Sequence, residues 1–265
     1  MRTLIASALL MLAATSVDAA MVVKPINYTV DKTVFAGHLV YDDASKALRP
    51  GLVMVPNWMG ETESAVDKAK VIASTDYVIL VADMYGEGVR PKNAEEASAQ
   101  VGKLYADRAV LRARINEAVA TLRAQVGKAP LLPGKIAAIG FCFGGSTVLE
   151  LARSGADIAG VVSFHGGLST SMPAAKDSIR TPILVLNGAD DRGTSLEDIG
   201  KFNDEMNTAG ADWQFVNFSG AVHCFAEADA NSPPGCLYNE RAAKRAYRMM
   251  RDFLSERFAA TAAGM

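Results

Sequence analysis

The chain has 265 residues, of which 50% are hydrophobic, and its 27 basic and 29 acidic side chains leave a formal net charge of −2. A chain of this size and composition can bury the core of one ordinary globular domain. The balanced charge and the lack of a Lys/Arg cluster argue against binding to nucleic acid, and against any partner recognised by bulk charge.

Residues 1–19 have the pattern of a secretory signal peptide. Arg2 precedes an apolar run over residues 4–14, and Val17 and Ala19 place small side chains at the −3 and −1 positions of a cleavage site. The run is too short to span a bilayer permanently, and an uncleaved N-terminal anchor is the alternative interpretation. We expect cleavage after Ala19 or Ala20, a single mature domain over residues 20–265, and a secreted or periplasmic protein without a stable membrane anchor.

Beyond this segment, short apolar runs alternate with helical stretches. A hairpin is expected over residues 28–41, followed by a turn at 42–45. Further strands are expected at 52–56, 77–82, 136–139, 158–164, 182–187 and 213–218, and helices at 61–74, 94–126 with a break near 105–107, 147–153, 195–209 and 239–258. Continuous apolar strands that alternate with helices indicate an α/β fold, in which a mostly parallel central sheet has helices on both faces.

Polar side chains follow several of these strands at the point where each strand ends. In parallel sheets, functional groups gather at the carboxyl ends of the strands. We therefore expect one site at this edge of the sheet, built from side chains that lie far apart in the chain: Asn57, Asp83, Cys142, Asp190 and His223.

The strongest local signal is Gly140-Phe141-Cys142-Phe143-Gly144, which lies between a predicted strand and a predicted helix. This is the thiol form of a nucleophile elbow, a sharp strand-to-helix turn that presents the nucleophile at a strained position. The flanking glycines leave room for the turn, and the N-terminus of the helix favours a thiolate. A buried structural cysteine in a glycine-rich turn is the alternative, but the context favours a nucleophile.

A thiol nucleophile requires a base, and the base requires an orienting acid. Of the three histidines, His38 lies in the hairpin, far from the strand ends. His165 follows a strand and is either a wall of the site or a core histidine. His223 comes late, in a loop that contains glycine, and is the expected base. Asp190 and Asp191 compete for the role of the acid.

Two backbone N–H groups are expected to form an oxyanion hole. One belongs to Phe143, the residue after the nucleophile, and the other to Trp58 in the loop that follows the strand at 52–56.

The chain has three cysteines, and an odd count in an exported protein suggests one pair and one free thiol. If Cys142 is the nucleophile, Cys224 and Cys236 form the pair. Their disulfide closes a loop that contains Pro233, Pro234 and Gly235. It is expected to hold the adjacent His223 in place, with two unpaired thiols as the alternative.

Over nearly the whole mature chain, the sequence resembles the dienelactone hydrolase family of the α/β-hydrolases. The segments that carry the resemblance are 55–60 (VPNWMG), 82–86 (ADMYG), 140–145 (GFCFGG), 187–190 (NGAD) and 223–225 (HCF). The resemblance implies an α/β-hydrolase fold and a Cys142, Asp190 and His223 triad, because the family's spacing favours Asp190 over Asp191. It also implies hydrolysis of a lactone or ester through a thioester, without metal or cofactor. We further expect a substrate pocket lined by Asn57, Tyr85, His165 and Phe225.

Two positions depart from the family pattern. Asn57 stands where the family usually has a glutamate that helps the thiol lose its proton, and an amide cannot take up a proton. Glu227 stands where the family has an arginine that grips an anionic substrate, and residues 93–102 lack the family's second arginine. An acid in place of a cation argues against an anionic substrate.

These features predict an exported cysteine hydrolase, monomeric or homodimeric, that acts on a small ester or lactone. A non-catalytic binding protein on the same fold is the alternative that Asn57 and Glu227 favour. A thiol redox protein is disfavoured because the chain has no C-x-x-C motif.

Overall fold

The structure is a computed structural model that describes residues 21–263, without the side chains of 260–263. The predicted signal peptide at residues 1–19 lies outside the described residues. Within the described part of the chain, no helix is long and apolar enough to cross a membrane.

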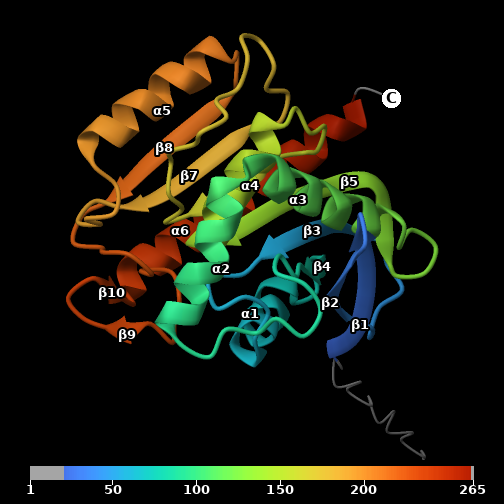
Figure 1. The fold of residues 1–265 in the computed structure, drawn as a ribbon. Coiled ribbons are helices and arrows are strands. Elements are labelled where there is room, and N and C mark those ends of the chain that lie inside the picture. The colour runs from blue at the N-terminus through green and yellow to red at the C-terminus, as the bar shows by residue number, and fades with distance from the viewer. Residues whose placement is uncertain (1–20, 264–265) are drawn as a thin grey trace, which may run out of the picture.

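An eight-stranded sheet runs through the centre of the molecule in the order β1-β2-β4-β3-β5-β6-β7-β8 (Figure 1). Its strands are β1 (Met21–Val30), β2 (Thr33–Asp42), β3 (Arg49–Val55), β4 (Val78–Val81), β5 (Leu131–Phe141), β6 (Val161–Phe164), β7 (Ile183–Gly188) and β8 (Trp213–Phe218). The hairpin β1–β2 is antiparallel and joins β4 in antiparallel orientation, while the strands from β4 to β8 are all parallel. The predicted mostly parallel sheet is therefore confirmed.

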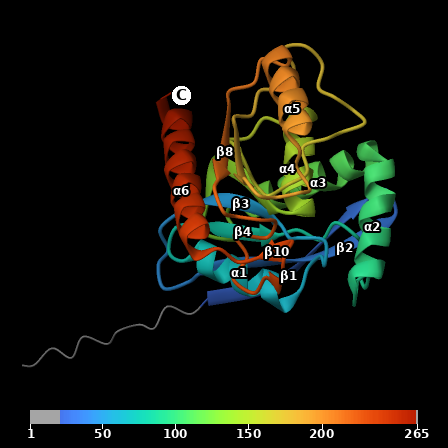
Figure 2. The same ribbon diagram turned by 90° about the vertical axis from the view of Figure 1, so that its left-hand side faces the viewer.

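Helices cover both faces of this sheet (Figure 2). On one side lie α2 (Ala94–Ala106), α3 (Arg108–Arg123), α4 (Phe143–Arg153) and α5 (Leu196–Thr208), and on the other lie α1 (Glu63–Ala73) and α6 (Glu240–Ala263). Successive side chains of a strand point to opposite faces, so Val53 and Val55 of β3 join the first core, while Leu52 and Met54 join the second. All four residues of β4 are fully buried, which explains its continuous apolar sequence.

Three features refine the predicted elements. The hairpin begins at Met21, because residues 21–27 extend the pairing with β2, and its turn is at 31–32. The expected break in the long helical stretch lies at Asp107, whose side chain accepts the N–H of Val110 and caps α3. A small hairpin of β9 (Asn231–Ser232) and β10 (Cys236–Leu237) had no sequence signal beyond its cysteine and prolines.

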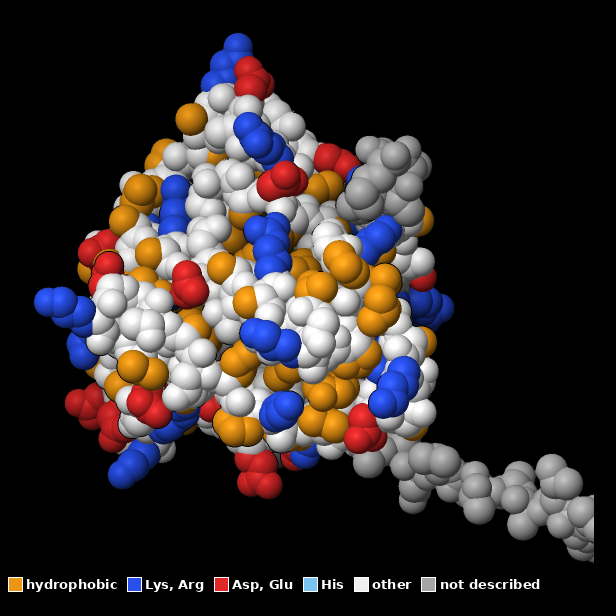
Figure 3. All heavy atoms as spheres, turned by 90° about the vertical axis from the view of Figure 1, so that its right-hand side faces the viewer, with side chains coloured by type: hydrophobic (Ala, Val, Ile, Leu, Met, Phe, Trp, Pro, Cys, Tyr) orange, Lys and Arg blue, Asp and Glu red, His pale blue; other side chains and the backbone are white. Residues whose placement is uncertain are grey.

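Figure 3 shows the face that carries the edge of the sheet near β1. Basic and acidic side chains of both signs are interspersed there with apolar ones. No single-sign patch dominates this face, so it offers no footprint for a highly charged partner.

Candidate active site

The elbow between β5 and α4 places Cys142 at the carboxyl edge of the sheet. Cys142 has a φ of 54°, a left-handed conformation that is strained for a residue with a side chain. The turn is possible because its glycines touch backbone. A Cβ on Gly140 would lie 2.0 Å from the Gly144 carbonyl oxygen, and one on Gly144 would lie 2.0 Å from the Val55 carbonyl oxygen. The sulfur thus projects from the N-cap of α4.

His223 bridges the thiol and a carboxylate. Its Nε2 lies 3.1 Å from Cys142 Sγ, and its Nδ1 lies 2.7 Å from Asp191 Oδ2. The thiol is half-buried, whereas Asp191 is only 6% exposed. The three side chains, from the segments after β5, β7 and β8, therefore meet in the order thiol, imidazole and carboxylate.

The expectation that Asp190 is the acid is wrong in this geometry. The chain turns after β7, and the Asp191 N–H donates to the Gly188 carbonyl oxygen, 3.1 Å away. This turn directs Asp191 inward, where its Oδ1 also accepts the N–H of Gly193 at 2.8 Å, and leaves the Asp190 side chain exposed. Asp190 contributes its backbone instead, because its N–H donates to the Ala221 carbonyl oxygen and ties the acid loop to the His223 loop.

The surroundings of His223 favour its charged form. Burial lowers its pKa, but the hydrogen bonds to Asp191 and Cys142, with the charges of those groups, outweigh burial and raise the pKa to about 10. An imidazolium next to a sulfur is the partner that a thiolate requires.

The two expected oxyanion donors belong to segments next to the thiol: Phe143 follows Cys142 in the chain, and Trp58 lines the same pocket as Cys142. Neither the Trp58 N–H nor the Phe143 N–H donates to another residue of the described chain. The loop with Trp58 is held on both sides, because the Tyr85 hydroxyl donates to the Trp58 carbonyl oxygen at 2.7 Å and Asn57 Oδ1 accepts the Met59 N–H at 3.0 Å. The Tyr85 ring also stacks on Phe143, with centroids 5.6 Å apart, so it connects the Trp58 loop with the residue after Cys142.

Asn57 belongs to a buried network that sequence reasoning did not find. Its Nδ2 donates to Glu227 Oε2 at 2.7 Å, and Lys68 Nζ of α1 donates to the same oxygen at 2.5 Å. Glu227 is only 2% exposed, and Lys68 neutralises its charge. Lys68 lies on the predicted helix at 61–74 with no motif around it, so no signal in the sequence connected it to the site.

His165 backs the elbow and does not line the substrate pocket. It is 1% exposed, and its Nδ1 accepts the Cys142 N–H at 3.2 Å. Burial lowers the pKa of His165 well below its ordinary value, with the charges of His223 and Lys68 adding to the effect. The ring is therefore neutral, and its Nε2–H faces Glu227 Oε1, 3.8 Å away. Its position agrees with the core interpretation.

The pocket at Cys142, called the catalytic pocket below, has a volume of about 340 Å³ and lies between the loop of Asn57 and Trp58 and the loop of His223. Of the four predicted pocket residues only Asn57 lines it; Tyr85, His165 and Phe225 lie one layer behind, where Phe225 is fully buried. Its lining residues are Asn57, Trp58, Cys142, His223, Cys224, Glu227, Asp229, Ala230, Asn231, Ser232 and Cys236. The lining contains two carboxylates and neither Lys nor Arg.

The predicted disulfide between Cys224 and Cys236 is present, with Cα atoms 5.0 Å apart. It joins the residue after His223 to β10. Next to it, the Leu237 N–H donates to the His223 carbonyl oxygen at 3.1 Å. The disulfide and this hydrogen bond together hold the loop that carries His223. Among the described residues, no group of three His, Cys, Asp or Glu side chains is placed to bind a metal ion.

Residues 35–258 match the model of the dienelactone hydrolase family. The chain is similar to a solved dienelactone hydrolase-like promiscuous phosphotriesterase from metagenomic libraries, at 36% identity and a TM-score of 0.83 over 89% of this chain and 98% of that one. It is similar to the structure of m3DLH at 34% identity and a TM-score of 0.82 over the same shares. An uncharacterised Caenorhabditis elegans protein is 33% identical over 129 residues, which are 47% of this chain and 82% of that protein.

Proposed function

Since the chain belongs to the dienelactone hydrolase family, we propose that it hydrolyses small uncharged esters or lactones through a thioester on Cys142. One observation carries the proposal: the His223 ring lies within hydrogen-bond reach of both the Cys142 sulfur and the buried Asp191 carboxylate. A binding protein on the same fold would have no need of this arrangement at a strained cysteine.

In the first half of the reaction, the Cys142 thiolate attacks the carbonyl carbon of the ester. The N–H groups of Trp58 and Phe143 stabilise the oxyanion that forms, and losing one such donor typically costs about 100- to 1,000-fold in rate. The C–O bond then breaks, and the imidazolium of His223 gives its Nε2 proton to the leaving alkoxide. The acyl group remains on the sulfur as a thioester.

In the second half, neutral His223 takes a proton from water, and the hydroxide attacks the thioester carbonyl. Collapse of this second oxyanion breaks the C–S bond, releases a carboxylic acid and restores the thiolate–imidazolium pair. Asp191 keeps the proton on Nδ1 throughout, so that Nε2 always faces the sulfur and the leaving group.

The pocket supports uncharged substrates over anionic ones. Glu227 and Asp229 line it without a Lys or Arg among the lining residues, and since Lys68 neutralises Glu227, Asp229 is the carboxylate there without a paired cation in the described part of the chain. A substrate carboxylate would meet like charge there. The relative described as a promiscuous phosphotriesterase makes uncharged phosphotriesters a second candidate class.

We propose an exported location for the mature protein. The Cys224–Cys236 disulfide supports it, because such bonds persist in oxidising compartments, and the pattern of residues 1–19 is that of an export signal.

The test is a burst experiment with a p-nitrophenyl ester of a short acid, followed by mass measurement of the intact protein. We expect a burst of one p-nitrophenol per site and an acyl adduct on Cys142. Cys142→Ala is expected to lose both while keeping its fold. Paraoxon serves as the phosphotriester substrate for comparison with the ester. Turnover by Cys142→Ala close to that of the wild type would refute the proposal, and slow labelling without turnover would indicate a binding protein.

A further inference from the structure

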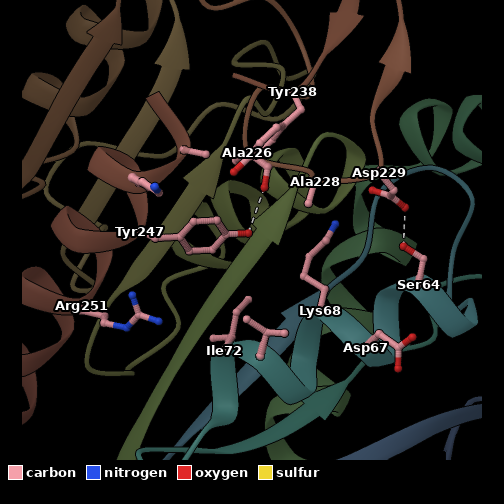
Figure 4. Close-up of a pocket in the computed structure, with 13 residues that line it drawn as sticks. Ser64, Asp67, Lys68, Ile72, Ala226, Ala228, Asp229, Tyr238, Tyr247 and Arg251 are labelled. Atoms are coloured by element: carbon pink, nitrogen blue, oxygen red, sulfur yellow. Dashed lines mark hydrogen bonds between the residues drawn. The ribbon is translucent and has the colours of Figure 1, made fainter. Parts of the chain in front are cut away.

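A second pocket lies between α1 and α6, on the other side of the Lys68–Glu227 pair from the catalytic pocket. It has a volume of about 490 Å³. Its walls are Ser64, Asp67, Lys68, Val71 and Ile72 of α1, Ala243, Lys244, Tyr247 and Arg251 of α6, and Ala226, Ala228, Asp229 and Tyr238 of the loop between them (Figure 4). Aliphatic side chains and tyrosine rings form most of the interior.

The charges around this pocket leave one cation, Arg251, without an ion-pair partner among the described residues. Lys244 pairs with Glu240, Asp67 pairs with Lys70, and the Ser64 hydroxyl donates to Asp229. Among the described residues, the guanidinium of Arg251 has no hydrogen bond or ion pair, and in Figure 4 it is directed from α6 toward Ile72. An apolar pocket with a free guanidinium at its mouth matches a ligand that has an apolar body and one carboxylate.

Lys68 connects this pocket to the catalytic site. Its ammonium has three N–H donors, of which Glu227 Oε2 takes one, and its side chain remains 13% exposed in the pocket wall. Glu227 in turn holds the Asn57 amide, and Asn57 holds the Met59 N–H in the loop of the oxyanion hole. A carboxylate that approached Lys68 would therefore compete with Glu227, two hydrogen bonds away from that loop.

We propose that the α1–α6 pocket is a second ligand site for a small apolar carboxylate, and that its occupation weakens catalysis through Lys68, Glu227 and Asn57. Val71, which is 73% exposed at the pocket wall, supplies apolar contact for the ligand body. The binding step does not depend on the proposed hydrolase activity, whereas the effect on catalysis rests on it.

Binding is tested by fluorine NMR with 4-fluorobenzoate, and 4-fluorobenzamide serves as the uncharged control. Cys142 is the free cysteine of the described chain, so iodoacetamide blocks the catalytic pocket selectively. We expect 4-fluorobenzoate, and not the amide, to bind the alkylated protein as well as the unmodified one. Arg251→Met is expected to weaken binding about tenfold or more, the size of one charge-assisted hydrogen bond. Val71→Asp is expected to weaken it as well, because it replaces an apolar contact by a charge of the same sign as the ligand.

Arg248→Met is the matched control, because Arg248 is exposed on the same helix outside the pocket lining. Equal thermal midpoints would show that each variant is folded. Loss of binding on alkylation, with no effect of Arg251→Met and Val71→Asp, would place the ligand in the catalytic pocket and overturn the proposal. So would the absence of binding at millimolar probe.

The effect on catalysis is tested by initial rates at increasing 4-fluorobenzoate. We expect partial inhibition that lowers kcat about fivefold at saturation with little change in KM, within the usual size of coupling between sites. Arg251→Met is expected to remove this inhibition. Purely competitive inhibition would overturn the coupling. A failure to form an acyl-enzyme would refute the hydrolase proposal alone, since the NMR result stands without turnover.

Discussion

Replacing Asp191 by Asn, with Asp190→Asn as the matched control, tests the placement of the acid. The bond from His223 Nδ1 to Asp191 Oδ2 is 2.7 Å long and buried, and a hydrogen bond to a charged group contributes roughly 1.5–3 kcal/mol, or about 10- to 100-fold in rate. An Asn side chain can also donate its amide to Nδ1, which moves the ring proton to Nε2 and leaves no base for the thiol. Together these effects predict a loss in kcat/KM of about 100- to 10,000-fold.

The pH profile adds an independent readout. With a pKa raised to about 10, His223 is an imidazolium at neutral pH and loses its proton only as the pH rises through that value. The falling alkaline limb of kcat/KM therefore reports His223. Asp191→Asn removes a hydrogen bond that raises this pKa, so the limb is expected to move to lower pH, while Asp190→Asn leaves it in place.

The assay is kcat/KM for a p-nitrophenyl ester across the pH range, with thermal midpoints to show that both variants are folded. Asp190→Asn is expected to stay within about threefold of the wild type, because its exposed carboxylate contacts nothing in the site and its backbone hydrogen bond is unchanged. A large loss in Asp190→Asn together with near-normal activity in Asp191→Asn would refute this geometry.

Three further variants address the supports of the site. Gly144→Ala brings a Cβ to 2.0 Å from the Val55 carbonyl oxygen and is expected to lower the thermal midpoint sharply; Gly102→Ala in α2, where nothing lies within 4 Å, is expected to stabilise by about 0.5–1 kcal/mol. Loss of the disulfide in Cys224→Ser/Cys236→Ser should lower the free energy of unfolding by about 3 kcal/mol, which shifts the thermal midpoint by roughly 6–12 °C, and should also lower kcat. An unchanged midpoint and kcat would show that the loop holds His223 without the disulfide. Glu227→Gln leaves Lys68 without its carboxylate and should destabilise the protein by less than the roughly 3–5 kcal/mol that breaking a fully buried pair costs. The double variant Lys68→Met/Glu227→Gln should recover part of this stability loss in denaturant unfolding. Stability losses that simply add in the double variant would argue against an interaction between the two side chains.

The sequence was sufficient for the sheet and for the strand-to-helix turn that carries Cys142. Buried parallel strands require continuous apolar runs, and the elbow requires glycines at fixed offsets, so both leave local patterns. The choice between Asp190 and Asp191 leaves no such pattern. The two are adjacent and chemically identical, and only the hydrogen-bonded turn from Gly188 decides which carboxylate faces His223.

The Glu227 network could not be predicted for a different reason. Asn57 and Glu227 are separated by 170 positions, and Lys68 and Glu227 by 159. Taken alone, Asn57 and Glu227 are departures from the family pattern, and Lys68 is an ordinary residue of a predicted helix. Their pairing exists only after α1 and the His223 loop pack against the same end of β3.

This pairing changes what Asn57 means for catalysis. The sequence suggested a site that lacks an acidic group beside the thiol, but a carboxylate is present one hydrogen bond away, from Glu227, and it is already neutralised by Lys68. Such a carboxylate positions the oxyanion loop through Asn57 and has no free charge with which to take the thiol proton. Proton removal from Cys142 then falls to His223, whose raised pKa and contact with the sulfur suit it to that role. Placing a second carboxylate at this point, as in Asn57→Glu, would set two acids against one ammonium, and we expect it to lower kcat/KM without giving the thiol a better base.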